Sequence, residues 1–103
     1  MKLELGNTLK ELRLSKKLSI KQVEEKTGID KSLITRFEKS NRTPNKTHIN
    51  QLATLYKVSP KSLNVLLLSE KIYSLLEFEE NALEALIVAE NRVEYESKKK
   101  PVL

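Results

Sequence analysis

Apolar side chains recur at three- and four-residue spacing along almost all of this chain, and few residues interrupt the pattern. Such spacing gives a helix one apolar face, whereas a strand requires alternation at every second residue. The 103 residues include only two glycines and three prolines, the residues that most often mark helix ends. The sequence therefore predicts an all-α fold made of one small domain and a short appendage.

Capping residues divide the first two thirds of the chain into five expected helices. Ser19 and Asp30 are favourable N-caps, and Gly28 is a favourable left-handed helix end. The helices are expected over residues 5–16, 20–27, 31–39 and 46–56, with a fifth that starts at Ser59-Pro60. The side chains expected to face inward are Leu9, Leu12, Val23, Ile29, Ile34, Phe37, Ile49, Leu52, Ala53, Tyr56, Leu63, Leu66 and Leu67.

Residues 19–38 combine two short helices with a turn that contains glycine. Two helices of about eight residues joined in this way are typical of the helix-turn-helix motif. The side chains expected to pack in the angle between them are Val23, Ile29, Ile34 and Phe37. The opposite face of the second helix stays free, and a DNA major groove about 12 Å wide accepts one helix. This arrangement predicts binding to double-stranded DNA.

Five segments spread over residues 5–67 extend the pattern beyond a single motif. They read LKELRLSKKLS, TGIDKS, LITRFE, KSNRTPN and LATLYKVSPKSL. In these segments the chain resembles the phage lambda-repressor/Cro (XRE) helix-turn-helix family. The resemblance implies a five-helix lambda-repressor-like DNA-binding domain at residues 1–68. It also implies a homodimer that regulates transcription, most often as a repressor, from a pseudo-palindromic operator.

The resemblance assigns base reading to the outer face of the helix expected at residues 31–39. Transferred position by position, the base-reading residues are Lys31, Ser32, Leu33, Thr35 and Arg36, with Leu33 placed against a thymine methyl group. Lys31 and Arg36 are long enough to reach guanine O6 and N7, and a good bidentate pair discriminates by about 1–3 kcal/mol. A plain solvated helix face is the alternative interpretation.

Contacts to the DNA backbone are expected around this helix, because basic side chains and helix N-termini attract phosphates. The expected residues are Lys17, Ile20, Lys21, Lys39, Asn41, Arg42, Thr43 and Lys46. Relatives usually carry glutamine at the position of Ile20, so only its backbone is expected to take part. For each lysine, ordinary surface charge is the alternative interpretation.

The family resemblance also bears on three charged residues. Arg13 and Glu38 match a pair that forms a salt bridge between the first and third helices. They are expected to fix the angle of the third helix and to have no catalytic role. Glu24 stands where relatives prefer alanine, so its side chain is expected to tilt outward or to find a basic partner.

Charge changes sign along the chain, although the total is +5. Residues 1–62 carry 14 basic and 6 acidic residues, whereas residues 63–97 carry 2 basic and 8 acidic residues. The basic part is typical of a surface that binds nucleic acid, and the acidic part is expected to face elsewhere.

Residues 69–97 are expected to form an acidic, amphipathic C-terminal helical extension, with a break at residues 78–81 and a last helix over 79–96. Its apolar stripe comprises Ile72, Leu75, Leu76, Leu83, Leu86, Ile87 and Val93. Amphipathic helices depend on packing, so the stripe needs a surface: a second copy, the fifth helix of the same chain, or a foreign protein. Residues 98–103 are expected to form a disordered tail.

An antitoxin-like protein, whose extension binds a partner while the head represses its own operon, is the main alternative function. An enzyme is not expected, because the chain offers no nucleophilic triad, phosphate loop or paired carboxylates in an apolar pocket. With no cysteine and a single histidine, His48, neither a metal site nor a cofactor is expected. No apolar run approaches the roughly 20 residues of a membrane span, so a cytoplasmic protein is expected.

Overall fold

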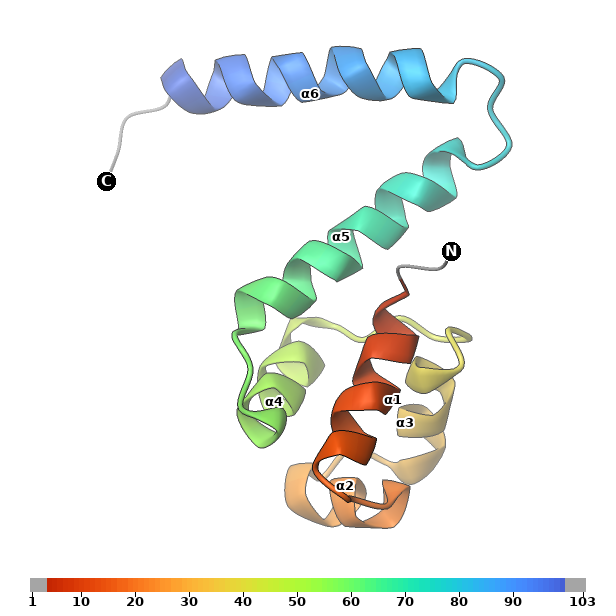
Figure 1. The fold of residues 1–103 in the computed structure, drawn as a ribbon, viewed down its shortest axis with the longest axis vertical. Helices are drawn as coiled ribbons and strands as arrows, with labels where there is room; N and C mark the ends of the chain where they lie inside the picture. The colour runs from red at the N-terminus through yellow and green to blue at the C-terminus, as the bar shows by residue number, and fades with distance from the viewer. Residues whose placement is uncertain (1–3, 100–103) are drawn as a thin grey trace. The chain divides into compact units, whose positions relative to one another are not determined.

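The computed structural model describes residues 4–99, and every regular element in that range is an α-helix. In chain order the helices are α1 (Leu5–Ser15), α2 (Ile20–Thr27), α3 (Lys31–Glu38), α4 (Lys46–Tyr56), α5 (Pro60–Leu76) and α6 (Ala82–Lys99) (Figure 1). The prediction of an all-α fold is confirmed.

The chain separates into two compact units. The first unit, here called the head, comprises residues 1–71 and contains α1 to α4 and most of α5. The second unit comprises residues 72–103 and contains the last residues of α5 together with α6.

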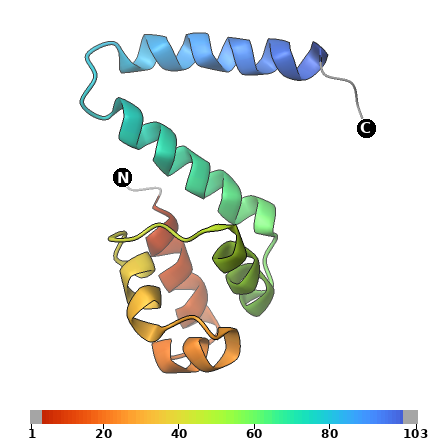
Figure 2. The same ribbon diagram turned by 180° about the vertical axis from the view of Figure 1, so that it is seen from behind.

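One hydrophobic core fills the head, and each of its helices contributes to it. The buried apolar residues are Leu5, Leu9, Val23, Ile29, Ile34, Phe37, Ile49, Leu52, Ala53, Tyr56, Leu63 and Leu67. α3 packs against both α1 and α2, as the view from behind shows (Figure 2). All four side chains predicted for the angle of the helix-turn-helix are buried, whereas Leu12 and Leu66 are only partly buried. Packing therefore holds helices as short as α2 and α3 in place, since eight residues are too few for an isolated helix.

Polar side chains and one glycine fix the ends of the two helices of the motif. The Ser19 side chain accepts a hydrogen bond from the N–H of Gln22, and the Gln22 side chain accepts one from the N–H of Ser19. Gly28 ends α2 with φ at 79°, a left-handed conformation that favours glycine. The Asp30 side chain accepts a hydrogen bond from the N–H of Ser32 and starts α3. The caps predicted at Ser19, Gly28 and Asp30 are confirmed.

α5 is longer than the sequence pattern suggested. It continues without interruption to Leu76, beyond the domain boundary expected after residue 68. No glycine or proline follows Pro60 within this stretch, so nothing in the local chemistry ends the helix earlier. The described residues therefore form six helices, and the first part of the expected extension is the end of α5.

α6 lies later in the chain than the helix expected over residues 79–96. It begins at Ala82 and ends at Lys99. Near its end, Glu94 and Lys98 form an ion pair one turn apart, with 3.4 Å between Oε1 and Nζ. Such exposed pairs contribute only a few tenths of a kcal/mol. Residues 98 and 99, expected in a disordered tail, are therefore helical, and residues 100–103 lie outside the described residues.

Candidate nucleic-acid interface

α3 turns one side to the core and the other to solvent. Ile34 and Phe37, each 2% exposed, anchor it in the core of the head. Lys31, Ser32 and Arg36 are exposed, and their spacing places them on the side away from the two anchors. The structure thus brings three of the five predicted base-reading residues together on one open helix face.

The other two predicted base-reading residues are less accessible. Leu33 is half-buried and packs against the core of the head. Thr35 is also half-buried, and its hydroxyl donates a hydrogen bond to the carbonyl of Lys31 at 3.0 Å. With that proton engaged, Thr35 offers a base only an acceptor oxygen and its methyl group.

Two carboxylates occupy the N-terminus of α3. Glu24 Oε2 accepts a hydrogen bond from the backbone N–H of Lys31 at 2.9 Å, and Asp30 Oδ1 accepts one from that of Ser32 at 3.0 Å. Hydrogen bonds from the backbone and side chain of Ser32 lower the pKa of the Asp30 carboxyl. The partner of Glu24 is thus a backbone N–H of α3, which neither of the two alternatives expected from the sequence, an outward tilt or a basic side chain, had included.

The N-terminus of α2 is open where that of α3 is occupied. Within residues 4–99, no group accepts a hydrogen bond from the backbone N–H of Ile20 or Lys21. The side chain of Ile20 is half-buried against the core, whereas Lys21 is exposed. Free N–H groups at a helix N-terminus are well placed to bind an anion. The backbone of Ile20, and not its side chain, is therefore available to a phosphate.

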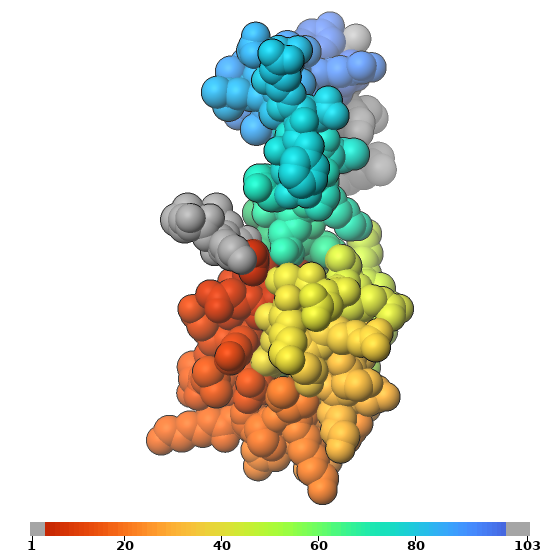
Figure 3. Space-filling view, turned by 90° about the vertical axis from the view of Figure 1, so that its right-hand side faces the viewer, coloured from red at the N-terminus to blue at the C-terminus, as the bar shows by residue number. Residues whose placement is uncertain are grey.

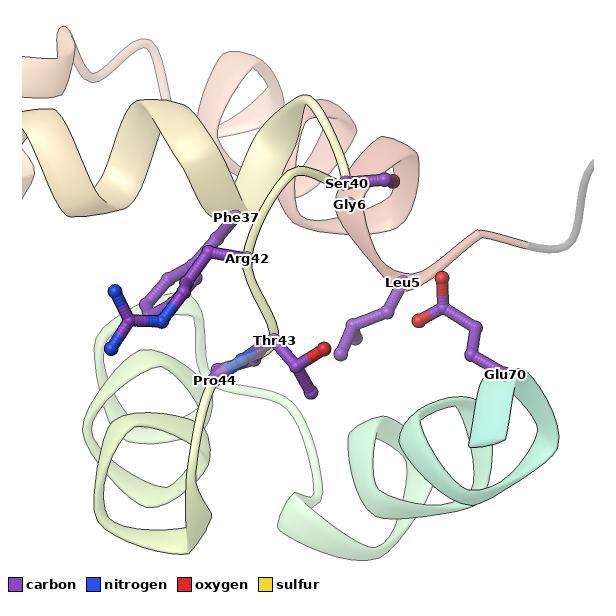
Figure 4. A pocket seen from close by; sticks show the side chains of 8 residues that line it. All are labelled: Leu5, Gly6, Phe37, Ser40, Arg42, Thr43, Pro44 and Glu70. Carbon is purple, nitrogen blue, oxygen red and sulfur yellow. The ribbon is translucent and has the colours of Figure 1, made fainter. Parts of the chain in front are cut away.

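The loop between α3 and α4 carries most of the other predicted phosphate contacts. The exposed residues among them are Lys39, Asn41, Arg42, Thr43 and Lys46, and Lys17 is exposed in the turn after α1. The loop is anchored by the buried Pro44 and lies beside the start of α1 (Figure 3). Arg42 is exposed, and in the close-up its guanidinium points away from Glu70 (Figure 4). The basic side chains of this loop are thus free to meet an external anion.

Arg13 and Glu38 join α1 to the last residue of α3. Arg13 Nε donates to Glu38 Oε2 at 2.8 Å, and Arg13 Nη2 donates to Glu38 Oε1 at 3.0 Å. Arg13 Nη1 donates to the carbonyl of Leu18 at 2.9 Å. The two side chains are 10% and 6% exposed, and the hydrogen bonds to Glu38 raise the pKa of Arg13. This two-point contact fixes the C-terminal end of α3 against α1.

Tyr56 was expected only as a core residue, but the charges of Arg13 and Glu38 also act on its hydroxyl. The hydroxyl oxygen is buried and has no hydrogen-bond partner among the described residues. Burial, and after it the charge of Glu38, raises the pKa of Tyr56 to about 12. Tyr56 therefore remains a neutral phenol beside the ion pair.

Gly6, which was not among the residues predicted to matter, permits a close approach between α1 and the end of α3. A Cβ at this position would lie 2.7 Å from Ser40 Oγ and 2.8 Å from the carbonyl oxygen of Glu38, and closer still to the carbonyl oxygen of Phe37. A glycine inside a helical pattern, where alanine is usually favoured, is the signal that could have found it.

Replacing Gly6 with alanine is expected to lower the free energy of unfolding by about 1–3 kcal/mol, the usual cost of overpacking. Helix propensity alone would make the alanine variant more stable by about 1 kcal/mol, so propensity and the close approach predict stability changes of opposite sign. Two of the atoms that the methyl group would meet belong to the backbone and cannot rotate away. Urea unfolding measures the effect, with the exposed neighbour Asn7→Ala as a near-neutral control. A Gly6→Ala protein more stable than the wild type would contradict the close approach.

Glu70 on α5 reaches toward the start of α1, beside a cavity of about 30 Å³ that has room for about one water molecule (Figure 4). The side chain is half-buried. Burial raises the pKa of its carboxyl, a hydrogen bond from the N–H of Leu5 lowers it, and the charge of Glu4 raises it, with a net upward shift. Folding therefore disfavours the charged form of Glu70 relative to the unfolded chain.

Replacing Glu70 with glutamine is expected to stabilise the head above about pH 4.5, the ordinary pKa of this carboxyl, but not below it. A carboxyl with a raised pKa favours the folded state while it is protonated, and this advantage disappears as the pH rises through the raised pKa. Glutamine stays neutral and still accepts from Leu5. Urea unfolding in acid and at neutral pH measures the difference, with Glu11→Gln at an exposed site as the control. Equal stabilisation at both pH values would contradict the expectation.

The second unit exposes most of its apolar side chains. Among the predicted stripe, the exposed residues are Ile72, Leu75, Leu83, Leu86, Ile87 and Val93, and Leu76 is half-buried. On α5 the head also exposes Val65 and Leu68, at 56% and 58%, which the sequence analysis did not include. In the part of the chain that the structure describes, no three metal-ligating side chains gather, and no helix is long and apolar enough to cross a membrane.

Residues 4–66 match the family model described as a helix-turn-helix domain, and this range is more than half of the chain. Among curated proteins and among solved structures, the comparison found no match. The matched range contains α1 to α4 and the first part of α5, and so includes the open face of α3 and the free N-terminus of α2.

Proposed function

Because the chain belongs to the helix-turn-helix domain family, we propose that it is a cytoplasmic, sequence-specific regulator of transcription that reads double-stranded DNA through α3. It acts as a homodimer on a pseudo-palindromic operator and represses transcription by occupying that site. The observation that carries the proposal is the open face of α3. Lys31, Ser32 and Arg36 face outward there, while Ile34 and Phe37 hold the helix to the core.

Phosphate contacts come from two parts of the head. One is the N-terminus of α2, with the free N–H groups of Ile20 and Lys21, and the other is the segment over residues 39–46, which runs from the end of α3 to the first residue of α4. Contacts of this kind release counterions and fix the register of the protein on the duplex, but they do not read sequence. The side chains on α3 therefore carry discrimination, and the surrounding charges supply general affinity.

Selection of bound duplexes from a random pool tests the proposal. The expected result is one enriched sequence with two-fold symmetry, because a dimer places two α3 helices in successive major grooves about 34 Å apart. An enriched sequence without symmetry would contradict the dimer but not base reading by α3. A pool without any enriched sequence would contradict sequence-specific binding itself.

A second copy of the chain is the proposed partner of the exposed apolar line on α5. Val65, Leu68, Ile72 and Leu75 are spaced three, four and three residues apart, which is the spacing of a heptad. β-Branched residues stand at the first position of each heptad and leucine at the fourth, a combination that favours two-stranded coiled coils. The four side chains are 44–76% exposed, so they offer apolar area to a partner.

Replacing Leu68 with glutamate is expected to convert the dimer into a monomer, because two carboxylates would meet in an apolar seam. Sedimentation equilibrium measures the mass, and Ser69→Glu, exposed beside the apolar line, is the matched control. The head should keep its fold, since Leu68 is 58% exposed in the single chain. A wild-type monomer, or a dimer that persists in Leu68→Glu, would contradict dimerisation through α5 and redirect the search to a foreign protein.

A further inference from the structure

Glu24 holds both ends of the turn in the helix-turn-helix. Its backbone carbonyl accepts a hydrogen bond from the N–H of Gly28 at 2.8 Å, where α2 ends. Its carboxylate accepts a hydrogen bond from the N–H of Lys31 at 2.9 Å, where α3 begins. A single residue of α2 therefore fixes the path of the chain into α3.

The bond to Lys31 also completes the N-terminus of α3. The Asp30 side chain accepts a hydrogen bond from the N–H of Ser32, and the Asp30 carbonyl accepts one each from those of Leu33 and Ile34, all at 3.0 Å. A free N–H at a helix N-terminus would attract a phosphate of any duplex, whatever its sequence. With Glu24 in place, α3 has no such group to offer, and a negative charge stands there instead.

The two ends of α3 are thus held by different helices. Arg13 of α1 holds Glu38 at the last residue, and Glu24 of α2 holds Lys31 at the first. Lys31 is also the first of the exposed residues on the open face. A shift of its backbone would move the side chains of the first turn relative to any base that they contact.

We infer that Glu24 is a positioning residue that sharpens discrimination between DNA sequences. Its carboxylate fixes the backbone of Lys31, and with it the register of the outward side chains, and it withholds a general phosphate-binding N–H from the duplex. The inference rests on the proposed function. Glu24 itself needs no contact with DNA, because both effects act through Lys31.

Three variants separate the hydrogen bond from the charge. Glu24→Gln removes the charge but keeps a side-chain oxygen that accepts from Lys31, whereas Glu24→Ala removes both. Glu25→Ala removes the same charge from the exposed neighbouring position and serves as the control. Each protein is titrated with the selected operator and with a random duplex of equal length, and amide exchange of Lys31 is measured in the free protein.

Glu24→Ala is expected to lower the ratio of operator affinity to random-duplex affinity about tenfold, the scale of one mismatched base pair. Its binding to random duplex is not expected to weaken, because a phosphate-binding N–H is set free. Glu24→Gln should keep the wild-type ratio, since the hydrogen bond remains, and Glu25→Ala should keep it as well. Exchange of the Lys31 amide should accelerate in Glu24→Ala alone.

Two outcomes would overturn the inference while leaving the proposed function intact. One arises if the wild type clearly prefers the operator over random duplex and Glu24→Ala shows the same affinity ratio. The other is an equal loss in Glu24→Ala and Glu24→Gln, because the charge and not the hydrogen bond would then carry the effect. A wild-type protein without preference for any duplex would overturn the proposed function and this inference together.

Discussion

Replacement of Arg36 with alanine is expected to remove the preference for the operator over random duplex while leaving weak general binding largely intact. Arg36 is exposed on α3, and no described side chain pairs with its guanidinium. A bidentate contact with guanine discriminates by about 1–3 kcal/mol, which is roughly a 5- to 150-fold change in the affinity ratio. General binding depends on many phosphates, so the loss of one charge changes it little. Titration of both duplexes at one fixed salt concentration measures the two affinities.

Arg36→Lys is the matched control for charge, because lysine keeps the positive charge but lacks the planar fork of donors. It is expected to lose most of the discrimination and still to bind random duplex as tightly as the wild type. The thermal midpoints of the three proteins should coincide, since Arg36 makes no buried contact. An equal loss of affinity for both duplexes in Arg36→Ala would contradict base reading and assign Arg36 to a phosphate.

Replacement of Glu38 with alanine is expected to lower the free energy of unfolding of the head by about 3–5 kcal/mol, the usual cost of leaving a buried charge unpaired. The guanidinium of Arg13, whose side chain is 10% exposed, would keep only the carbonyl of Leu18 at 2.9 Å. Each kcal/mol lowers the thermal midpoint of a domain of this size by about 4–8 °C. Calorimetry therefore detects the loss easily. The loss is a large share of the free energy of unfolding of a typical protein, which is roughly 5–15 kcal/mol.

The double variant Arg13→Met with Glu38→Leu tests whether the loss comes from the unpaired charge. Buried ion pairs are replaced by apolar side chains of similar volume at little net cost, so most of the stability is expected to return. Operator discrimination is not expected to return with it, because the two-point contact that orients the end of α3 is gone. A Glu38→Ala protein as stable as the wild type would contradict a stabilising role for the pair.

Features that depend on nearby residues were predictable from the sequence. The caps at Ser19, Gly28 and Asp30 involve groups within a few positions, and their chemistry is local. The burial of Ile34 and Phe37 follows from helical spacing, and so does the exposure of the opposite face of α3. The fold class and the open face of α3 could therefore be predicted from the sequence alone.

Features that depend on contacts between distant residues were not predictable. Gly6 matters only because α1 approaches the end of α3, which lies far along the chain. The partner of Glu24 depends on the turn that brings Lys31 back toward α2. The domain boundary expected after residue 68 falls inside α5, since apolar spacing shows which side of a helix faces inward but not where a domain ends along it.

The contacts that hold α3 use its backbone, its inward side chains and its last residue. The outward side chains of Lys31 and Arg36 take no part in them, so substitutions at these two positions are expected to cost little stability. Under the proposed function, exchange of these two side chains is expected to change which DNA sequence the head prefers while the head stays folded.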